Sequence, residues 1–240
     1  MKASVHSFES FAALDGEGLR FAVFFSGCPL RCAFCHNPDT WERGEENFTP
    51  SELVRKISRY KPYFGLRGGA TFSGGEPLCH AAFLKETVPL LEKEGIGFVV
   101  DTSGAVALTC EVAFVLKRAQ SVLLDLKFTR DEDYRRFTGK GIGQTLEILA
   151  FLEKIGKDTV LRTVIVPGIN DSEDAIRDYG RLSRGFSCVR RHELLAFHTL
   201  GFFKYERLGI KNPLQDTPPL SRERLKDLQK ILDQERKKNG

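Results

Sequence analysis

The chain has 240 residues, of which 41% are hydrophobic and 28% are charged. This composition excludes intrinsic disorder and fibrous repeats, and the length is sufficient for a large buried core. The net charge of +4 is too small and too scattered to indicate a nucleic-acid-binding protein. No apolar run reaches the roughly 18 residues that span a bilayer, and the N-terminus lacks the apolar region of a signal peptide. We therefore expect a cytoplasmic protein without a membrane contact.

Runs rich in β-branched and aromatic residues alternate along the chain with segments that carry helix signals. The expected strands are 21–26, 70–73, 97–101, 121–125, 159–166 and 191–195. Helices are expected after the capping box Thr49-Pro50-Ser51-Glu52 and over 82–94, 144–155, 171–183 and about 222–236, with Pro89 arguing against one unbroken second helix. This alternation predicts parallel βαβ units in one α/β domain, as an open doubly wound sheet or a partial barrel.

Chemically active side chains follow the expected strands at the ends where each strand finishes. The active sites of parallel α/β folds lie at the C-terminal ends of the strands, so these segments should meet at one edge of the sheet. Five of the segments are Cys28–His36, Gly74–Pro77, Asp101–Gly104, Asp125–Lys127 and the stretch that ends at His198. The fifth strand carries Arg162 on the face that it shares with Val164 and Val166, so its guanidinium should point inward and need an anionic partner.

Six cysteines are present, and three of them, Cys28, Cys32 and Cys35, fall within eight residues. Disulfide frameworks belong to short secreted chains, so we expect a metal site in this loop. Three thiolates would leave one iron of a [4Fe-4S] cluster without a protein ligand, and His36 would complete a zinc site. From spacing alone the cluster is favoured over zinc, and zinc over free thiols. The dispersed Cys79, Cys110 and Cys188 are interpreted as core or incidental thiols.

The spacing Cys-x3-Cys-x2-Cys, with Phe34 before the last cysteine, resembles the signature of the radical S-adenosylmethionine (SAM) superfamily. Further segments resemble the activating enzymes of glycyl radical enzymes: His6–Ser10, Asp15–Phe21, Cys35–Trp41, Ser73–Glu76, Asp101-Thr102, Leu124–Lys127 and Val166–Gly168. The resemblance extends over essentially the whole chain. It implies a single radical SAM domain, residues 1–240, folded as a partial (β/α)6 TIM-like barrel of parallel strands.

The resemblance also implies the chemistry. One [4Fe-4S] cluster held by Cys28, Cys32 and Cys35 would reductively cleave SAM, and the 5′-deoxyadenosyl radical would remove a hydrogen from a glycine of a partner glycyl radical enzyme. Pyruvate formate-lyase is the expected partner, and its contact should be transient. A flavodoxin- or ferredoxin-type protein is the expected electron donor. We expect a monomer that acts as an oxidoreductase of the glycyl radical activase type.

The resemblance assigns roles to individual residues of this sequence. Phe34 and His36 would lie against the adenine, and Glu76, after Gly74 and Gly75, would meet the amino group of SAM. The remaining cofactor-binding positions are Asp101, Ser103, Asp125, Leu126, Lys127, Arg162 and His198, with a monovalent cation near Asp101 and Asp125. Asp15, Gly16 and Glu17 would contact the glycine loop of the partner, although Glu17 stands where the family has proline.

Simpler interpretations of the same residues remain open. Phe34 can be loop packing, Gly-Gly-Glu-Pro an ordinary turn, and His198 a structural histidine. Asp125 and Lys127 can form an ion pair that closes the barrel mouth, because buried charges are usually paired. For the whole protein, the alternatives are a radical SAM enzyme acting on a small molecule, such as 7-carboxy-7-deazaguanine synthase, and a zinc-binding module without catalysis.

Overall fold

The computed structural model describes residues 1–238 and divides into two compact units. The first unit consists of residues 1–29 and 40–123, and the second of residues 30–39 and the chain from 124 onward. Seven strands are hydrogen-bonded in the order β1 to β7, so the sheet has two edges and is unclosed. This mostly parallel α/β sheet confirms the predicted fold class.

The first unit begins with the antiparallel pair β1 (Val5–Ala12) and β2 (Arg20–Phe25), and β3 and β4 continue the sheet in parallel. Its other elements are β3 (Gly69–Gly74), β4 (Phe98–Thr102), the start of β5 (Ser121–Asp125), α1 (Pro50–Ser58), α2 (Ala81–Lys93) and α3 (Cys110–Arg118). Short 3-10 helices occupy 38–40, 61–63 and 77–80.

Local sequence signals explain two of these helices. Thr49 and Glu52 form the predicted capping box, in which each side chain binds the backbone N–H of the other residue. α2 is unbroken in spite of Pro89. Pro89 and Lys85 are both exposed, so the Lys85 carbonyl that loses its helical donor lies on the solvent side. The helix predicted over 82–94 is therefore confirmed, and Pro89 does not interrupt it.

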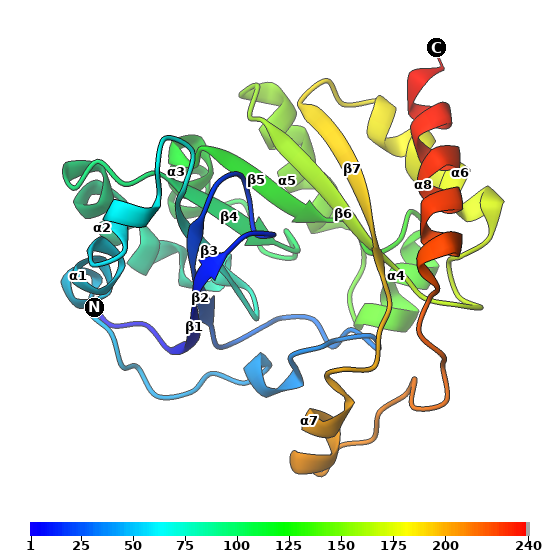
Figure 1. Ribbon diagram of the computed structural model, residues 1–240, viewed down its shortest axis with the longest axis horizontal. Coiled ribbons are helices and arrows are strands. Elements are labelled where there is room, and N and C mark those ends of the chain that lie inside the picture. The colour runs from blue at the N-terminus through cyan, green and yellow to red at the C-terminus, as the bar shows by residue number, and fades with distance from the viewer. Residues whose placement is uncertain (239–240) are drawn as a thin grey trace. The chain divides into compact units, whose positions relative to one another are not determined.

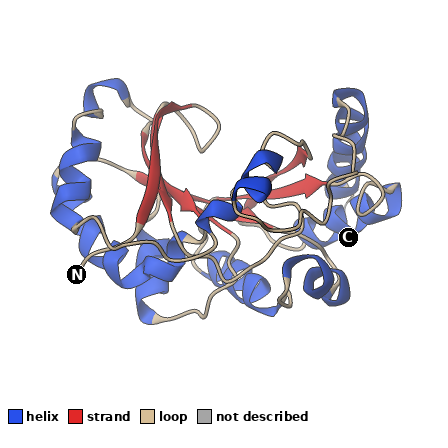
Figure 2. Ribbon diagram, turned by 90° about the horizontal axis from the view of Figure 1, so that it is seen from below, coloured by secondary structure: helices blue, strands red, loops and turns tan. Residues whose placement is uncertain are grey.

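The sheet of the first unit has an outer, helix-covered face and an inner face (Figure 2). On the outer face, the ring of Phe25 stacks on His80 at 4.9 Å and meets Phe83 of α2 edge-on at 6.2 Å. Side chains alternate along a strand, so the residues next to these point to the inner face. The inner face therefore carries Arg20, which bonds Thr71, and also carries Ser73, which bonds Asp101.

The second unit contains the end of β5, then β6 (Thr159–Ile165) and β7 (Val189–Ala196), which pair in parallel. Its helices are α4 (Asp131–Thr138), α5 (Gly143–Lys154), α6 (Glu173–Arg184), α7 (Phe202–Arg207) and α8 (Arg222–Lys237). Figure 1 shows α8, in red, packed beside α6 and β7. The fully buried Leu228 and Leu232 form the apolar face of α8.

All six predicted strands are present. Besides the three short 3-10 helices, one strand and three α-helices were not predicted: β1, α3, α4 and α7. β1 alternates buried and exposed residues irregularly, as expected for an edge strand with a bulge in its register. No helix within the described residues is long and apolar enough to cross a membrane.

Candidate active site

The three-cysteine loop passes from the first unit, which contains Cys28, to the second, which contains Cys32 and Cys35. None of the three thiols is in a disulfide. The Cys28 N–H donates to the carbonyl of Trp41 at 3.0 Å, and the Cys35 N–H to that of Cys32 at 3.0 Å. Burial raises the pKa of the Cys32 thiol to about 12, with the ammonium of Lys127 opposing this shift.

A segment of the second unit that sequence reasoning missed also holds this loop. In α7, the Tyr205 hydroxyl donates to the carbonyl of Cys35 at 2.9 Å. The Lys204 ammonium donates to Asn37 Oδ1 at 2.7 Å and to Asp39 Oδ1 at 3.0 Å. The two partners in each of these hydrogen bonds are 165–170 residues apart in the sequence, so no local sequence pattern predicts the contacts.

The Gly-Gly-Glu turn of the first unit follows β3. An added side chain at Gly75 would approach the Gly27 carbonyl oxygen at 2.5 Å, so the glycine is required by the backbone against which it packs. The fully buried Glu76 carboxylate accepts four hydrogen bonds: Leu78 N–H at 3.1 Å, Thr102 hydroxyl at 2.6 Å, Ser103 N–H at 2.9 Å and Ser103 hydroxyl at 2.5 Å. Burial raises the pKa of Glu76, and these hydrogen bonds oppose that rise.

These four hydrogen bonds occupy the roughly four lone-pair positions of the Glu76 carboxylate. Glu76 therefore joins the end of β3 to the end of β4, and Ser103 is brought into the same cluster. Asp101, the last inner-facing residue of β4, accepts a hydrogen bond from Ser73 Oγ at 2.7 Å. The structure thus brings together four predicted site residues of the first unit, Gly75, Glu76, Asp101 and Ser103.

Asp15, Gly16 and Glu17 lie in the segment between β1 and β2. The Asp15 carbonyl accepts a hydrogen bond from Thr71 Oγ1 at 2.7 Å, and the position of a Gly16 side chain would be 3.2 Å from Val99. Thr71 and Val99 point to the inner face of the sheet, so this segment lies on the face that carries Ser73 and Asp101. Arg20, which sequence analysis missed, fixes the segment by donating to the Glu17 carbonyl at 2.8 Å.

A charged triad forms the centre of the predicted site in the second unit. Asp125 accepts a hydrogen bond from Lys127 Nζ at 2.6 Å and one from Arg162 Nε at 3.3 Å. Burial alone would raise the pKa of Asp125, but the two cations outweigh it and lower that pKa. Burial also disfavours the Lys127 charge, yet Asp125 raises the pKa of Lys127. Arg162 has the anionic partner that its inward position required.

Leu126 links this triad to the sheet. Its N–H donates to the Arg162 carbonyl at 2.9 Å, and its carbonyl accepts from Thr163 Oγ1 at 2.7 Å. The side chain of Leu126 is fully buried. These contacts make Leu126 the residue that sets the register of Asp125 and Lys127 against β6.

The predicted aromatic residues of the second unit form two contacts. Phe34 is buried against Phe128, with 6.1 Å between ring centroids, which is the packing that sequence left open as an alternative. The rings of His36 and His198 stack at 3.8 Å, and His36 Nε2 donates to the His198 carbonyl at 3.0 Å. Burial, helped by His198, lowers the pKa of His36 to about 4. Nδ1 of His198 is buried and has no hydrogen-bond partner among the described residues.

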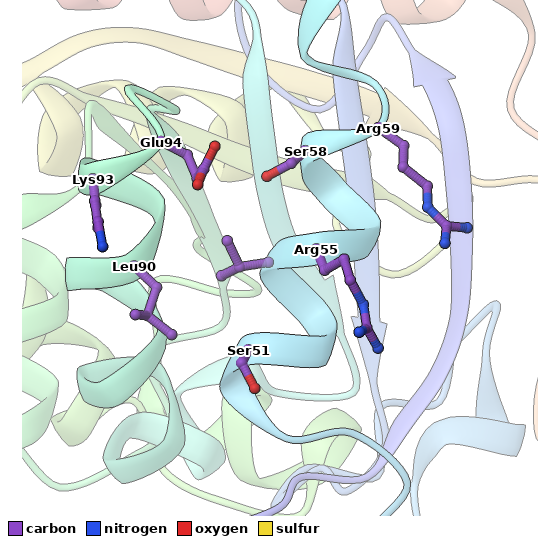
Figure 3. Close-up of a pocket in the computed structure, with 8 residues that line it drawn as sticks. Ser51, Arg55, Ser58, Arg59, Leu90, Lys93 and Glu94 are labelled. Atoms are coloured by element: carbon purple, nitrogen blue, oxygen red, sulfur yellow. The ribbon is translucent and has the colours of Figure 1, made fainter.

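A cleft of about 500 Å³ between α1 and α2 contains none of the predicted site residues. It is lined by Val54 and Leu90 and by polar residues that include Arg55, Arg59 and Lys93. Figure 3 shows Arg55 and Arg59 extending away from α2, so the cations do not converge. Within residues 1–238, no three His, Cys, Asp or Glu side chains are gathered as a metal-binding set.

Comparison with known proteins agrees with these features. Residues 22–179 match the family model of the radical SAM superfamily. The chain is 42% identical over 230 residues to the pyruvate formate-lyase-activating enzyme of Clostridium pasteurianum, covering 95% of this chain and 96% of that one. It is 36% identical over 235 residues to the enzyme of the same name from Staphylococcus epidermidis, covering 95% and 94%.

Solved structures share the fold. A domain of a pyruvate formate-lyase-activating enzyme from Bacteroides vulgatus superimposes with a TM-score of 0.58 at 22% identity, covering 70% of this chain and 94% of that one. QueE from Escherichia coli superimposes with a TM-score of 0.57 at 17% identity, covering 88% and 92%.

The unclosed α/β sheet, the three-cysteine loop and the family match together define a member of the radical SAM superfamily. Identity of 42% over nearly the full length identifies the family within this superfamily. The chain belongs to the family of pyruvate formate-lyase-activating enzymes, and it is a radical SAM oxidoreductase of the activase type.

Proposed function

We propose that the protein cleaves SAM at a [4Fe-4S] cluster and installs a glycyl radical on a partner enzyme, pyruvate formate-lyase. One observation carries this proposal: three cysteine thiols lie within eight residues of a chain that is 42% identical to an enzyme named for activating pyruvate formate-lyase. Members of the radical SAM superfamily use such a cluster together with SAM.

The chemistry of the cysteine thiolates fits an iron–sulfur cluster. Cys28, Cys32 and Cys35 would be its ligands, and three sulfur donors leave one iron of four for a small molecule. The loop backbone is already held by Trp41 and Tyr205, so the thiols need no metal to define the path of the chain. When bound, the cluster would supply the electron that breaks a sulfur–carbon bond of SAM, and the 5′-deoxyadenosyl radical would take hydrogen from the glycine α-carbon.

In the first unit, the turn at Gly74 and Gly75 would hold the amino group of SAM. All four acceptor positions of Glu76 are used by its neighbours, so its first role is to fix this turn and Ser103. Contact between Glu76 and an ammonium group would require one of these hydrogen bonds to be exchanged. Asp101 would take part in cofactor or cation binding from the same face of the sheet.

In the second unit, the triad of Asp125, Lys127 and Arg162 carries two positive charges and one negative charge. Its net charge of about +1 suits the carboxylate of SAM, and Leu126 fixes its position. The stacked His36 and His198 offer a flat surface for adenine. The buried His198 Nδ1 supports this role, because a buried polar atom without a partner is costly and a ligand could satisfy it. Phe34 would back this surface through its packing on Phe128.

The partner's glycine loop would be met by Asp15, Gly16 and Glu17. This assignment is supported by their position on the sheet face that carries Ser73 and Asp101. Glu17 brings a negative charge where the family has proline, and it forms an exposed ion pair with Arg67 at 3.9 Å. A flavodoxin- or ferredoxin-type protein would supply the electron.

Cysteine substitutions test the proposal. Cys28→Ala, Cys32→Ala and Cys35→Ala should each abolish formation of 5′-deoxyadenosine and lower the iron content after anaerobic reconstitution. Cys79, like Cys28, is half-buried. Cys79→Ala and Cys110→Ala are therefore matched controls, and both should retain 5′-deoxyadenosine formation and the wild-type iron content. Full activity in the first three variants, or stoichiometric zinc in place of iron in the wild type, would contradict the proposal.

A further inference from the structure

Exposed apolar side chains in the first unit are concentrated in two short segments. Apart from Met1, every exposed large apolar residue of that unit within the described chain lies in 11–14 or 63–66. Leu14 is 90% exposed and Leu66 is fully exposed, while Phe11 and Tyr63 are about half exposed. Isolated exposed apolar residues are common on proteins, but a cluster from two loops indicates a contact surface.

The two segments form one surface, which we name the two-loop surface. The rings of Phe11 and Tyr63 meet edge-on, with 5.2 Å between centroids. Behind them, the chain at Gly18 approaches Gly68 so closely that an added side chain would lie 2.5 Å from the Gly68 nitrogen. Gly18 has a φ of +74°, which favours glycine. The two loops are therefore packed against each other.

Arg20 binds the chain that follows each of the two segments. Its NH1 donates to the carbonyl of Glu17, after the first segment, at 2.8 Å and to the carbonyl of Arg67, after the second, at 3.0 Å. It also donates to Thr71 Oγ1 at 2.7 Å, the Ala70 carbonyl at 2.7 Å and Gln120 Oε1 at 3.2 Å. The side chain is 1% exposed, so the guanidinium is held away from water.

Burying a guanidinium is costly, and burial lowers the pKa of Arg20 to about 10 although the charges of Asp15 and Glu17 oppose this shift. Phe11 adds a second cost, since its φ of +66° is strained for a residue other than glycine. The ring of Phe11 packs against Tyr60 and Tyr63, whereas Leu14 and Leu66 of the same surface extend into solvent. A strained residue and a buried charge beside exposed leucines favour a surface that binds a partner.

The surface continues into the candidate site. Its Leu14 is followed directly by Asp15, whose carbonyl is bound by Thr71 on the inner face of the sheet. A polypeptide whose reacting residue lies at Asp15 would therefore carry its neighbouring residues over Leu14 and Leu66. This continuity favours the protein substrate as the occupant.

We propose that the two-loop surface, residues 11–14 and 63–66, is the docking surface for the part of the glycyl radical enzyme that surrounds its target glycine. This inference rests on the proposed function for the identity of the partner. The partner should present an apolar face there, because the surface offers leucine and aromatic side chains. The two-loop surface would thus strengthen binding of the whole partner protein, while Asp15–Glu17 contact the glycine itself.

The test is a Leu14→Ser/Leu66→Ser double variant, with Leu208→Ser as the matched control. Leu208 is an exposed leucine at the end of α7 in the second unit. Binding of pyruvate formate-lyase is measured by biolayer interferometry under anaerobic conditions, and radical transfer is measured with the whole partner and with a heptapeptide that contains its glycine.

We expect the double variant to bind the partner at least tenfold more weakly and to show a similar rise in KM for the whole protein. The heptapeptide is too short to cover the whole surface, so its KM should rise less than the KM for the whole protein. The melting temperature should match the wild type, because both leucines are exposed. Unchanged affinity, an equal loss in Leu208→Ser or a wild type that does not bind the partner would overturn the docking surface. A wild type that binds but forms no glycyl radical would instead overturn the proposed function.

Discussion

Replacing Asp125 by asparagine should destabilise the protein by about 3–5 kcal/mol, which is the usual cost of leaving buried charges without their counterion. The side chains of Asp125, Lys127 and Arg162 are only 12–22% exposed. The asparagine side chain would keep the shape of the carboxylate but not its charge. The two cations would then remain in a poorly solvated position without the anion that holds them.

A second ion pair of the same unit provides the comparison. Asp158 and Arg190 are joined at 2.6 Å, the same distance as Asp125 and Lys127, but their side chains are 56% and 64% exposed. Water screens such a pair, so Asp158→Asn should cost only about 0.2–1 kcal/mol. Both substitutions replace a carboxylate oxygen by an amide nitrogen in an ion pair of equal length. The two sites differ in burial and in the second cation, Arg162, that Asp125 also binds.

Urea unfolding followed by circular dichroism at neutral pH measures both costs, with equal m-values as the check that the unfolded states are comparable. Combining Asp125→Asn with Lys127→Met should recover part of the loss. Because the pKa of folded Asp125 is lowered, its contribution is complete above the pKa of an unfolded aspartate, about 4. The contribution falls as the unfolded chain takes up the proton below that pH, and it is gone once the folded protein is protonated as well. Equal costs for Asp125→Asn and Asp158→Asn would refute the role of burial.

Other substitutions test separate parts of the structure. Burial lowers the pKa of His192 to about 3, so the unfolded chain binds the proton first and stability falls as pH drops below about 6.5. Between pH 7 and pH 5 this loss of stability is about 2 kcal/mol. The His192→Gln variant, whose side chain can still bond Thr163, should not show this pH-dependent loss when its unfolding is measured. An equal loss in the variant would contradict the assignment. Gly75→Ala should lower the melting temperature by several degrees, since its side chain would meet the Gly27 carbonyl; a wild-type value would show that the turn yields freely.

Local patterns predicted much of the fold. The capping box at Thr49 and the runs of β-branched residues gave the elements, because their determinants lie within a few neighbouring residues. The alternation of strands and helices gave the parallel topology. α3 was missed although Thr109 caps it, since a Thr-Cys-Glu start in a short segment is a weak signal.

Contacts between distant residues could not be predicted. Glu76 is saturated by groups that include Thr102 and Ser103, 26 and 27 positions away, and nothing near Glu76 in the sequence shows that its acceptors are already used. The fully buried position of Arg20 likewise depends on oxygens spread from residue 17 to residue 120. The sequence predicted candidate site residues, but it did not show which groups hold them in place.

Electron paramagnetic resonance of the partner tests the central claim most directly. The anaerobically reconstituted and reduced protein is mixed with SAM and pyruvate formate-lyase and frozen. We predict the doublet of a glycyl radical on the partner, together with methionine and 5′-deoxyadenosine, and no doublet with Cys32→Ala. Methionine and 5′-deoxyadenosine without any radical on the partner would contradict the claim and indicate a different substrate.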